Sequence, residues 1–167
     1  QAFGGPARVA LGFTPAYSMH PIIARTMGTR WVDGMRGAPS GVFDLTVESA
    51  IEQLHAARPH VVFLCSPNNP TGTALVLDAA PTSLVVVDEA YAEFARPGTP
   101  SAVTLLADHP LLVVTRTMSK AFALAGARLG YLAASPDVLD ALRLVRLPYH
   151  LSAPTQAVAL AAIGHHA

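Results

Sequence analysis

The sequence contains almost no lysine and almost no cysteine. Ten of its eleven basic residues are arginine, and Lys120 is the only lysine among 167 residues. Arginine cannot form a Schiff base and hardly ever loses its proton, whereas a lysine amine can do both, so Lys120 is a candidate for chemistry. The single cysteine, Cys65, excludes an internal disulfide and a cysteine-rich metal site. Its apolar surroundings predict a small core residue.

Long hydrophobic runs and an excess of charge of one sign are also lacking. Apolar runs such as Val61–Cys65 are far shorter than the roughly 18–20 residues of a membrane span, which predicts a soluble protein with no membrane partner. Charged residues make up 13% of the chain and the formal net charge is zero. This balance argues against disorder and against a nucleic-acid-binding surface. With 51% hydrophobic residues, the chain can build the core of one domain.

The sequence does contain short apolar runs that alternate with amphipathic stretches and turn residues. This alternation is typical of repeated βα units and predicts an α/β fold with a mostly parallel sheet. Several runs are apolar throughout, as strands covered on both faces are. The predicted strands are Arg8–Gly12, Thr29–Val32, Val61–Cys65, Leu84–Asp88, Leu111–Thr115 and Leu129–Ala133.

Three segments have helical patterns. Thr46–Ala57 carries an apolar stripe with helical spacing. Ser135 followed by Pro136 predicts a helix start, because serine caps helices and proline suits their first position. A further amphipathic segment covers Thr155–Ile163. The connection before the strand at 84–88 offers only residues 74–80 for a crossover helix, so we expect two turns or fewer there.

Polar residues follow three of the predicted strands. Ligands of open parallel sheets bind beyond the carboxyl ends of the strands, so these residues are the first candidates for a site. Taken singly, each segment is also explained as a turn, a solvated loop or a helix start. The segments are residues 66–73, 88–91 and 116–120, with Arg128 eight residues beyond Lys120.

Together these segments match the needs of one kind of ligand. A pyridine cofactor that acts as an electron sink needs a carboxylate at its ring nitrogen and donors at its phenolic oxygen. It also needs an amine for its aldehyde, and hydroxyl and guanidinium groups for its phosphate. Asp88 is the candidate for the ring nitrogen, and Asn69 and Tyr91 are the candidates for the phenolic oxygen. Lys120 is the candidate amine. The candidates for the phosphate are Ser119 and Arg128, with Thr117 as a weaker one.

These motifs, in this order, resemble those of the fold-type-I aminotransferases that depend on pyridoxal 5'-phosphate (PLP). The motifs are Asn-Asn-Pro-Thr-Gly-Thr at 68–73, Val-Val-Asp-Glu-Ala-Tyr at 86–91 and Ser-Lys-x7-Arg at 119–128. Residues 14–19, 120–131 and 146–149 are similar to the histidinol-phosphate aminotransferase family. The resemblance covers essentially the whole chain and implies a three-layer α/β/α domain.

The resemblance also implies a role for each candidate. Lys120 would bond to PLP and move a proton, and Asp88 would hold the pyridine nitrogen protonated. Asn69 and Tyr91 would bind the phenolic oxygen, Ser119 and Arg128 the phosphate, and Tyr17 would stack on the ring. The substrates implied are histidinol phosphate and 2-oxoglutarate in histidine biosynthesis, in a cytoplasmic homodimer without a metal site.

By the same resemblance, residues 1–167 form the PLP-binding large domain without its N-terminal arm and C-terminal small domain. We therefore expect the chain alone to bind PLP weakly and not to turn over. Alternatives that keep the same cofactor residues are an aromatic aminotransferase, an amino-acid-phosphate decarboxylase and a PLP-binding regulator. A remnant without activity is a further alternative.

Other titratable residues are assigned ordinary roles. Glu89 and Glu93 are interpreted as loop or surface acids. The histidines show no spacing typical of metal ligands, so we expect solvated or capping roles for them, including His20. His150 stays unassigned.

Overall fold

A six-stranded sheet forms the centre of the molecule in the computed structural model, which describes residues 1–37, 45–66 and 77–165. The strand order is β2-β1-β3-β4-β5-β6, with all neighbours parallel except β5 and β6. The predicted mostly parallel sheet is confirmed. Its strands are β1 (Val9–Thr14), β2 (Arg30–Met35), β3 (Val61–Cys65), β4 (Leu84–Asp88), β5 (Leu112–Thr117) and β6 (Gly130–Ala134).

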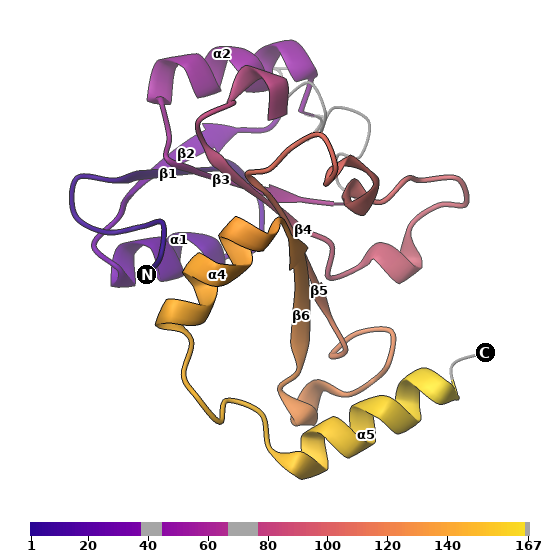
Figure 1. Cartoon of the computed structure of the whole chain (residues 1–167). Helices are drawn as coiled ribbons and strands as arrows, with labels where there is room; N and C mark the ends of the chain where they lie inside the picture. The colour runs from indigo at the N-terminus through magenta and orange to yellow at the C-terminus, as the bar shows by residue number, and fades with distance from the viewer. Residues whose placement is uncertain (38–44, 67–76, 166–167) are drawn as a thin grey trace.

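Helices cover both faces of the sheet, as the three-layer α/β/α prediction requires. In Figure 1, α2 lies over one face, and α1 and α4 lie against the other. Helix α5 lies away from the other helices, beside the end of the sheet at which β6 begins. The helices are α1 (Met19–Thr26), α2 (Val47–Ala57), α4 (Pro136–Val145) and α5 (Ala153–Gly164), with short 3-10 turns η1 (Ala92–Phe94), η2 (Ala102–Leu105) and η3 (Ala125–Ala127).

Alternate residues of the central strands fill two separate cores. On β3, the fully buried Val62 belongs to the core under α2, which also contains Leu54 of that helix. Its neighbour Val61 belongs to the core on the opposite face, with Ala24 of α1 and Val138 of α4. Because both faces of β3 and β4 are buried, these strands are apolar throughout, and their predicted bounds match the observed ones.

The local sequence explains how the helices begin. Thr46 caps α2, since its hydroxyl accepts a hydrogen bond from the Ser49 backbone at 3.2 Å. Ser152 caps α5 in the same way, by accepting a hydrogen bond from the Thr155 backbone, so the helix begins at Ala153, two residues before the predicted start. Ser135 precedes α4 as predicted, but its hydroxyl donates to the Pro110 carbonyl instead of capping the helix. The sequence analysis did not predict α1, although this helix carries a residue of the candidate site.

The crossover before β4 lies mostly outside the described residues, and residues 77–79 at its end are helical. Its predicted length therefore stays a prediction. Within the described ranges, no helix is both long and apolar enough to cross a membrane.

Candidate functional site

The carboxyl ends of the parallel strands surround an open cavity of about 590 Å³. This volume lies within the roughly 300–1,000 Å³ of sites that bind small molecules. Six of the seven residues predicted from the sequence line it, although they are spread over more than a hundred positions of the chain. They are Tyr17, Asp88, Tyr91, Ser119, Lys120 and Arg128.

Asp88 is the last residue of β4, at the inner end of the cavity. Its Oδ1 accepts a hydrogen bond from the Ala90 backbone at 3.1 Å. Its Oδ2 lies 3.2 Å from Nε2 of His20, which comes from α1. Both carboxylate oxygens are therefore held in position, and the carboxylate is still partly accessible from the cavity.

His20 is buried, with 6% of its surface exposed. Its ring stacks on Phe63 of β3, with the ring centroids 4.7 Å apart. Burial by itself lowers the pKa of the imidazole, but the hydrogen bond to Asp88 and the nearby Cys65 outweigh it and raise the pKa to about 9. The expected solvated or capping role is therefore wrong for His20, which is a protonated partner of Asp88 at neutral pH.

The raised pKa of His20 predicts a pH-dependent contribution to stability. A folded-state pKa above the ordinary 6.5 means that this contribution is fully present below pH 6.5 and is lost as the pH rises through about 9. We expect the free energy of unfolding to fall by about 2–3 kcal/mol over that range through this residue. Urea unfolding of the wild type and of His20→Gln measures it. Between pH 6.5 and 9, the free energy of unfolding should fall more steeply with pH in the wild type than in His20→Gln. Identical slopes in the two proteins would rule the effect out.

Lys120 follows β5 and is exposed to the cavity. Its Nζ lies 5.2 Å from the centre of the Tyr91 ring, which is itself half exposed. The lysine is held in a turn, since its carbonyl accepts a hydrogen bond from the Ala123 backbone at 2.9 Å. The amine thus lies over the phenol ring, and the two residues follow different strands.

A hydroxyl group and a guanidinium, those of Ser119 and Arg128, line the same cavity as Lys120. The Ser119 backbone donates to the Thr117 hydroxyl at 3.1 Å, which fixes the turn that carries Ser119. Arg128 adopts a left-handed backbone conformation with φ of 51°, and its guanidinium donates to the Ala125 carbonyl at 2.7 Å. The guanidinium also lines the cavity, where it can bind an anion.

Tyr17 lies at the edge of the cavity, directly after β1. It is 57% exposed, so it is not a core residue, which is the usual place of an aromatic at such a turn. Its ring meets that of His20 edge to face, with the centroids 5.4 Å apart. The exposed part of the ring lines the cavity, where it can cover a flat ligand.

The whole sequence, residues 1–167, matches the profile of the aminotransferase class I and II family. The chain belongs to this family. Among its curated relatives, the histidinol-phosphate aminotransferase of Thermobifida fusca is 62% identical and that of Frankia casuarinae is 60% identical. The alignments cover 98% and 99% of this chain but 45% and 43% of those proteins, so the chain spans less than half the length of these relatives.

A solved structure supports the same family. The crystal structure of histidinol-phosphate aminotransferase from Sinorhizobium meliloti in complex with pyridoxal-5'-phosphate superposes with a TM-score of 0.83 at 26% identity. The superposition covers 96% of this chain and 45% of that protein. The chain thus has the three-layer α/β/α fold that was predicted from the sequence, and it shares this fold with a solved histidinol-phosphate aminotransferase.

One acidic residue of the chain, Glu89, differs from the prediction, whereas Glu93 is exposed as expected. Glu89 was expected in a loop or at the surface; it lies in the loop directly after β4 but is buried there, with 1% of its surface exposed. Its carboxylate accepts hydrogen bonds from Ser101, from the Ala102 backbone and from Arg116, the last forming a 2.7 Å ion pair. Successive residues at the end of β4 face opposite ways, so Asp88 faces the cavity, whereas Glu89 connects the segment after β4 to Arg116 of β5.

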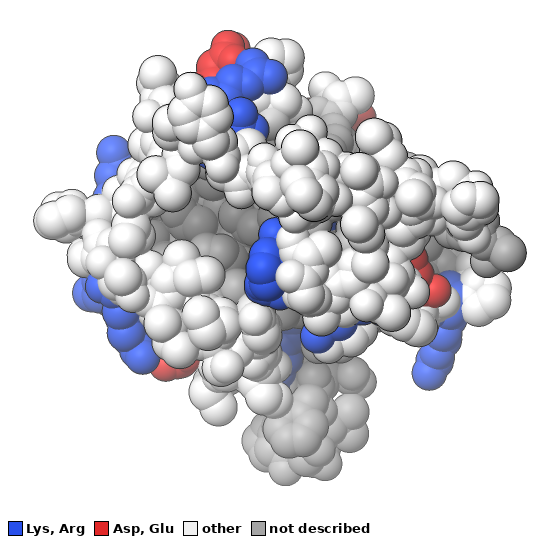
Figure 2. Space-filling view, turned by 90° about the horizontal axis from the view of Figure 1, so that it is seen from below, with Lys and Arg blue, Asp and Glu red and all other residues white. Residues whose placement is uncertain are grey.

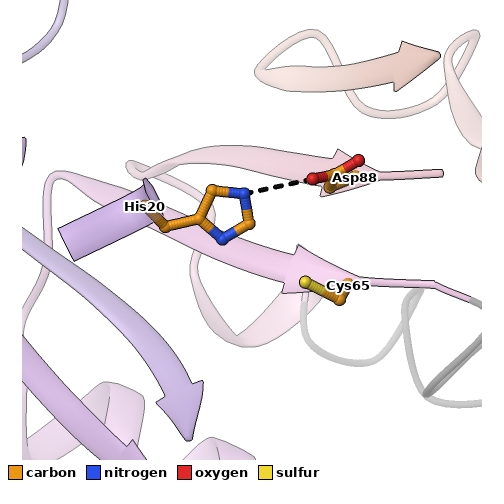
Figure 3. Close-up of side chains that lie close together, drawn as sticks. All are labelled: His20, Cys65 and Asp88. Atoms are coloured by element: carbon orange, nitrogen blue, oxygen red, sulfur yellow. Dashed lines mark hydrogen bonds and ion pairs between the residues drawn. The ribbon is translucent and has the colours of Figure 1, made fainter. Parts of the chain in front are cut away.

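The sequence analysis did not find His20 and Cys65 as part of the site, and Asn69 lies outside the described residues. Cys65 ends β3 and lines the cavity beside Asp88, so the predicted core role does not describe its position. Figure 3 shows its sulfur pointing toward His20 and Asp88. The position of Cys65 at the end of a predicted strand could have identified it as a site residue, because the same criterion identified Asp88.

Proposed function

We propose that the complete gene product is a PLP-dependent aminotransferase of histidine biosynthesis. It would move an amino group between histidinol phosphate and 2-oxoglutarate, giving imidazole-acetol phosphate and glutamate. The convergence of six predicted residues on one cavity carries the cofactor part of this proposal. The names of the relatives, at 60–62% identity over nearly all of this chain, support the substrate part.

Asp88 is assigned to the ring nitrogen of PLP, which supplies an electron sink for the substrate carbanion when bound. A carboxylate there keeps the nitrogen protonated. His20 and the Ala90 backbone each hold one oxygen of Asp88, so the carboxylate keeps its orientation. We assign His20 as the positioning residue of Asp88.

Lys120 is assigned two tasks. Its amine would hold the cofactor at its aldehyde, and the same amine would move a proton at the substrate carbon that bears the amino group. Tyr91, whose ring lies 5.2 Å from the lysine nitrogen, would donate to the phenolic oxygen of the cofactor. Asn69 is proposed as a second donor to that oxygen on the strength of its motif alone.

The phosphate of the cofactor is assigned to Ser119 and Arg128. A hydroxyl and a guanidinium make short, charge-assisted hydrogen bonds to phosphate oxygens, and both side chains line the same cavity as Lys120. Tyr17, exposed at its edge, would stack on the cofactor ring and exclude water from that face.

We further propose a homodimer in the cytoplasm. Figure 2 views the molecule from the side of α5, and most of the surface there is uncharged. Large exposed apolar patches are typical of surfaces that another chain or segment covers. The most exposed apolar residues of the region are Leu144, Leu147, Tyr149 and Leu160.

The cytoplasm is proposed because a phosphorylated, charged substrate cannot cross a membrane unaided. The enzyme that uses this substrate is therefore expected in the compartment in which the substrate is made.

Substrate choice is tested by turnover of the complete gene product with 2-oxoglutarate as amino acceptor. We expect histidinol phosphate to exceed phenylalanine in kcat/KM by at least about 100-fold, because a site built for a phosphate leaves charged groups unpaired with phenylalanine. Glutamate formation is the readout. An equal or higher value for phenylalanine would favour the aromatic aminotransferase. Carbon dioxide release from an O-phosphorylated amino acid, with no glutamate formed from histidinol phosphate, would favour the decarboxylase.

A further inference from the structure

Three side chains with different donor atoms meet at the wall of the cavity, which two of them, Cys65 and Asp88, line. His20 comes from α1, Cys65 from the end of β3 and Asp88 from the end of β4. One nitrogen, one sulfur and one oxygen of the three all lie within 4.8 Å of one another. Among residues 1–37, 45–66 and 77–165, this is the single group of three such donors.

The fold holds these donors in place. Cys65 and Asp88 are register partners on neighbouring parallel strands, so their side chains leave the sheet on the same face. The His20 ring is stacked on Phe63 and is almost fully buried. Figure 3 shows the imidazole and the sulfur both directed toward the space beside Asp88. Donors fixed in this way need little ordering to bind an ion.

The distances and donor types suit a tetrahedral ion of the zinc class. Bonds of about 2.0–2.3 Å to nitrogen, oxygen and sulfur place tetrahedral donors roughly 3.3–3.8 Å apart. His20 Nε2 and Asp88 Oδ2 are 3.2 Å apart, close to that value without movement. The thiol sulfur needs to approach by about 1 Å, which a cysteine rotation provides. Imidazole with thiolate selects zinc-class ions over magnesium or calcium.

We propose that His20, Cys65 and Asp88 bind one divalent ion of the zinc class in the cofactor-free protein. The ion replaces the protons of the imidazole and the thiol, which leave to solvent, and bonds to Nε2, Sγ and Oδ2. The fourth position opens into the cavity.

Metal and cofactor exclude each other at this site. The Asp88 carboxylate is assigned above to the cofactor ring nitrogen, and an ion bonded to Oδ2 removes that oxygen from the nitrogen. The exclusion of PLP by the metal rests on the proposed function, whereas the metal site itself does not. Zinc would thus delay loading of newly made or cofactor-stripped protein with PLP.

Metal binding is tested by titrating the cofactor-free complete gene product with Co²⁺, which reports thiolate ligation by a near-ultraviolet charge-transfer band. We expect the band to saturate at one equivalent and to be absent in Cys65→Ser. His20→Gln should weaken binding by at least about tenfold, since it removes one of three ligands. His55→Gln, which changes an exposed histidine of α2, should bind like the wild type. No band, a band retained in Cys65→Ser, or equal affinity in His20→Gln would overturn the proposal.

The exclusion of PLP is tested separately by borohydride trapping of PLP on Lys120. Saturating Zn²⁺ should reduce the labelled fraction of the wild type at least about tenfold, as expected for direct competition. The control is Cys65→Ser, which keeps Asp88 and Lys120 but lacks the thiol ligand. Its labelling should be nearly the same with and without Zn²⁺. Any decrease that it does show measures the PLP that Zn²⁺ binds in solution. If Co²⁺ binds as predicted but Zn²⁺ leaves wild-type labelling unchanged, the metal site stands and the placement of the cofactor on Asp88 is wrong.

Discussion

Lys120→Ala is expected to abolish both the cofactor absorbance band of the complete gene product and its turnover. Lys120 supplies the amine that bonds to PLP and also moves the proton at the substrate carbon, so one substitution removes two functions. Loss of such a group costs roughly 10³-fold or more in kcat. The measurements are the visible spectrum with PLP and the rate of glutamate formation from histidinol phosphate.

Lys120→Arg is the matched variant, because it keeps the positive charge in the cavity without a nucleophilic amine. If the lysine acts only as a charge that attracts phosphate, the arginine variant should keep most of the turnover. If it bonds to the cofactor, both variants should fail alike. An alanine variant with the band intact and turnover within tenfold of wild type would contradict the assignment.

Asp88→Asn should have the second largest effect, a loss of roughly 10²–10⁴-fold in kcat at saturating PLP. An amide cannot stabilise a protonated ring nitrogen, so the cofactor loses much of its capacity to accept the carbanion's electrons. The substitution also removes the ionic partner of the buried His20. Steady-state kinetics at several PLP concentrations separate the loss in kcat from weaker cofactor binding.

The control for Asp88 is Asp140→Asn on α4, which removes one carboxylate from an exposed ion pair with Arg143. This pair is 65–68% exposed, so its loss should leave the rate unchanged. Thermal unfolding of each variant checks that it folds. An Asp88→Asn enzyme that folds and keeps its rate within tenfold would refute the role of Asp88.

The strands that were predicted best are those whose environment is simplest. β3 and β4 are buried on both faces, so an unbroken apolar run marks each of them from end to end. β1 and β5 extend two residues beyond their predicted ends, as far as Thr14 and Thr117. At these ends the strands enter the polar site, where composition no longer distinguishes strand from loop.

Of the site, the sequence predicted the residues that bear ordered motifs, and it failed where the environment comes from other elements. Nothing near His20 in the sequence indicates a carboxylate, because its partner Asp88 is 68 residues away and is brought close by the strand order. Glu89 was misjudged for the same reason, since its burial depends on Arg116 and Ser101. Helix α1 was missed because Met19–Thr26 is short and contains Pro21.

The central claim, that this cavity binds PLP through Lys120, is tested most directly by borohydride reduction of the complete gene product loaded with PLP. Proteolysis and mass spectrometry then locate the modified residue. The account predicts one phosphopyridoxyl group on the peptide that contains Lys120 and none on that peptide in Lys120→Arg. A label on another residue, or no label on a folded protein saturated with PLP, would contradict it.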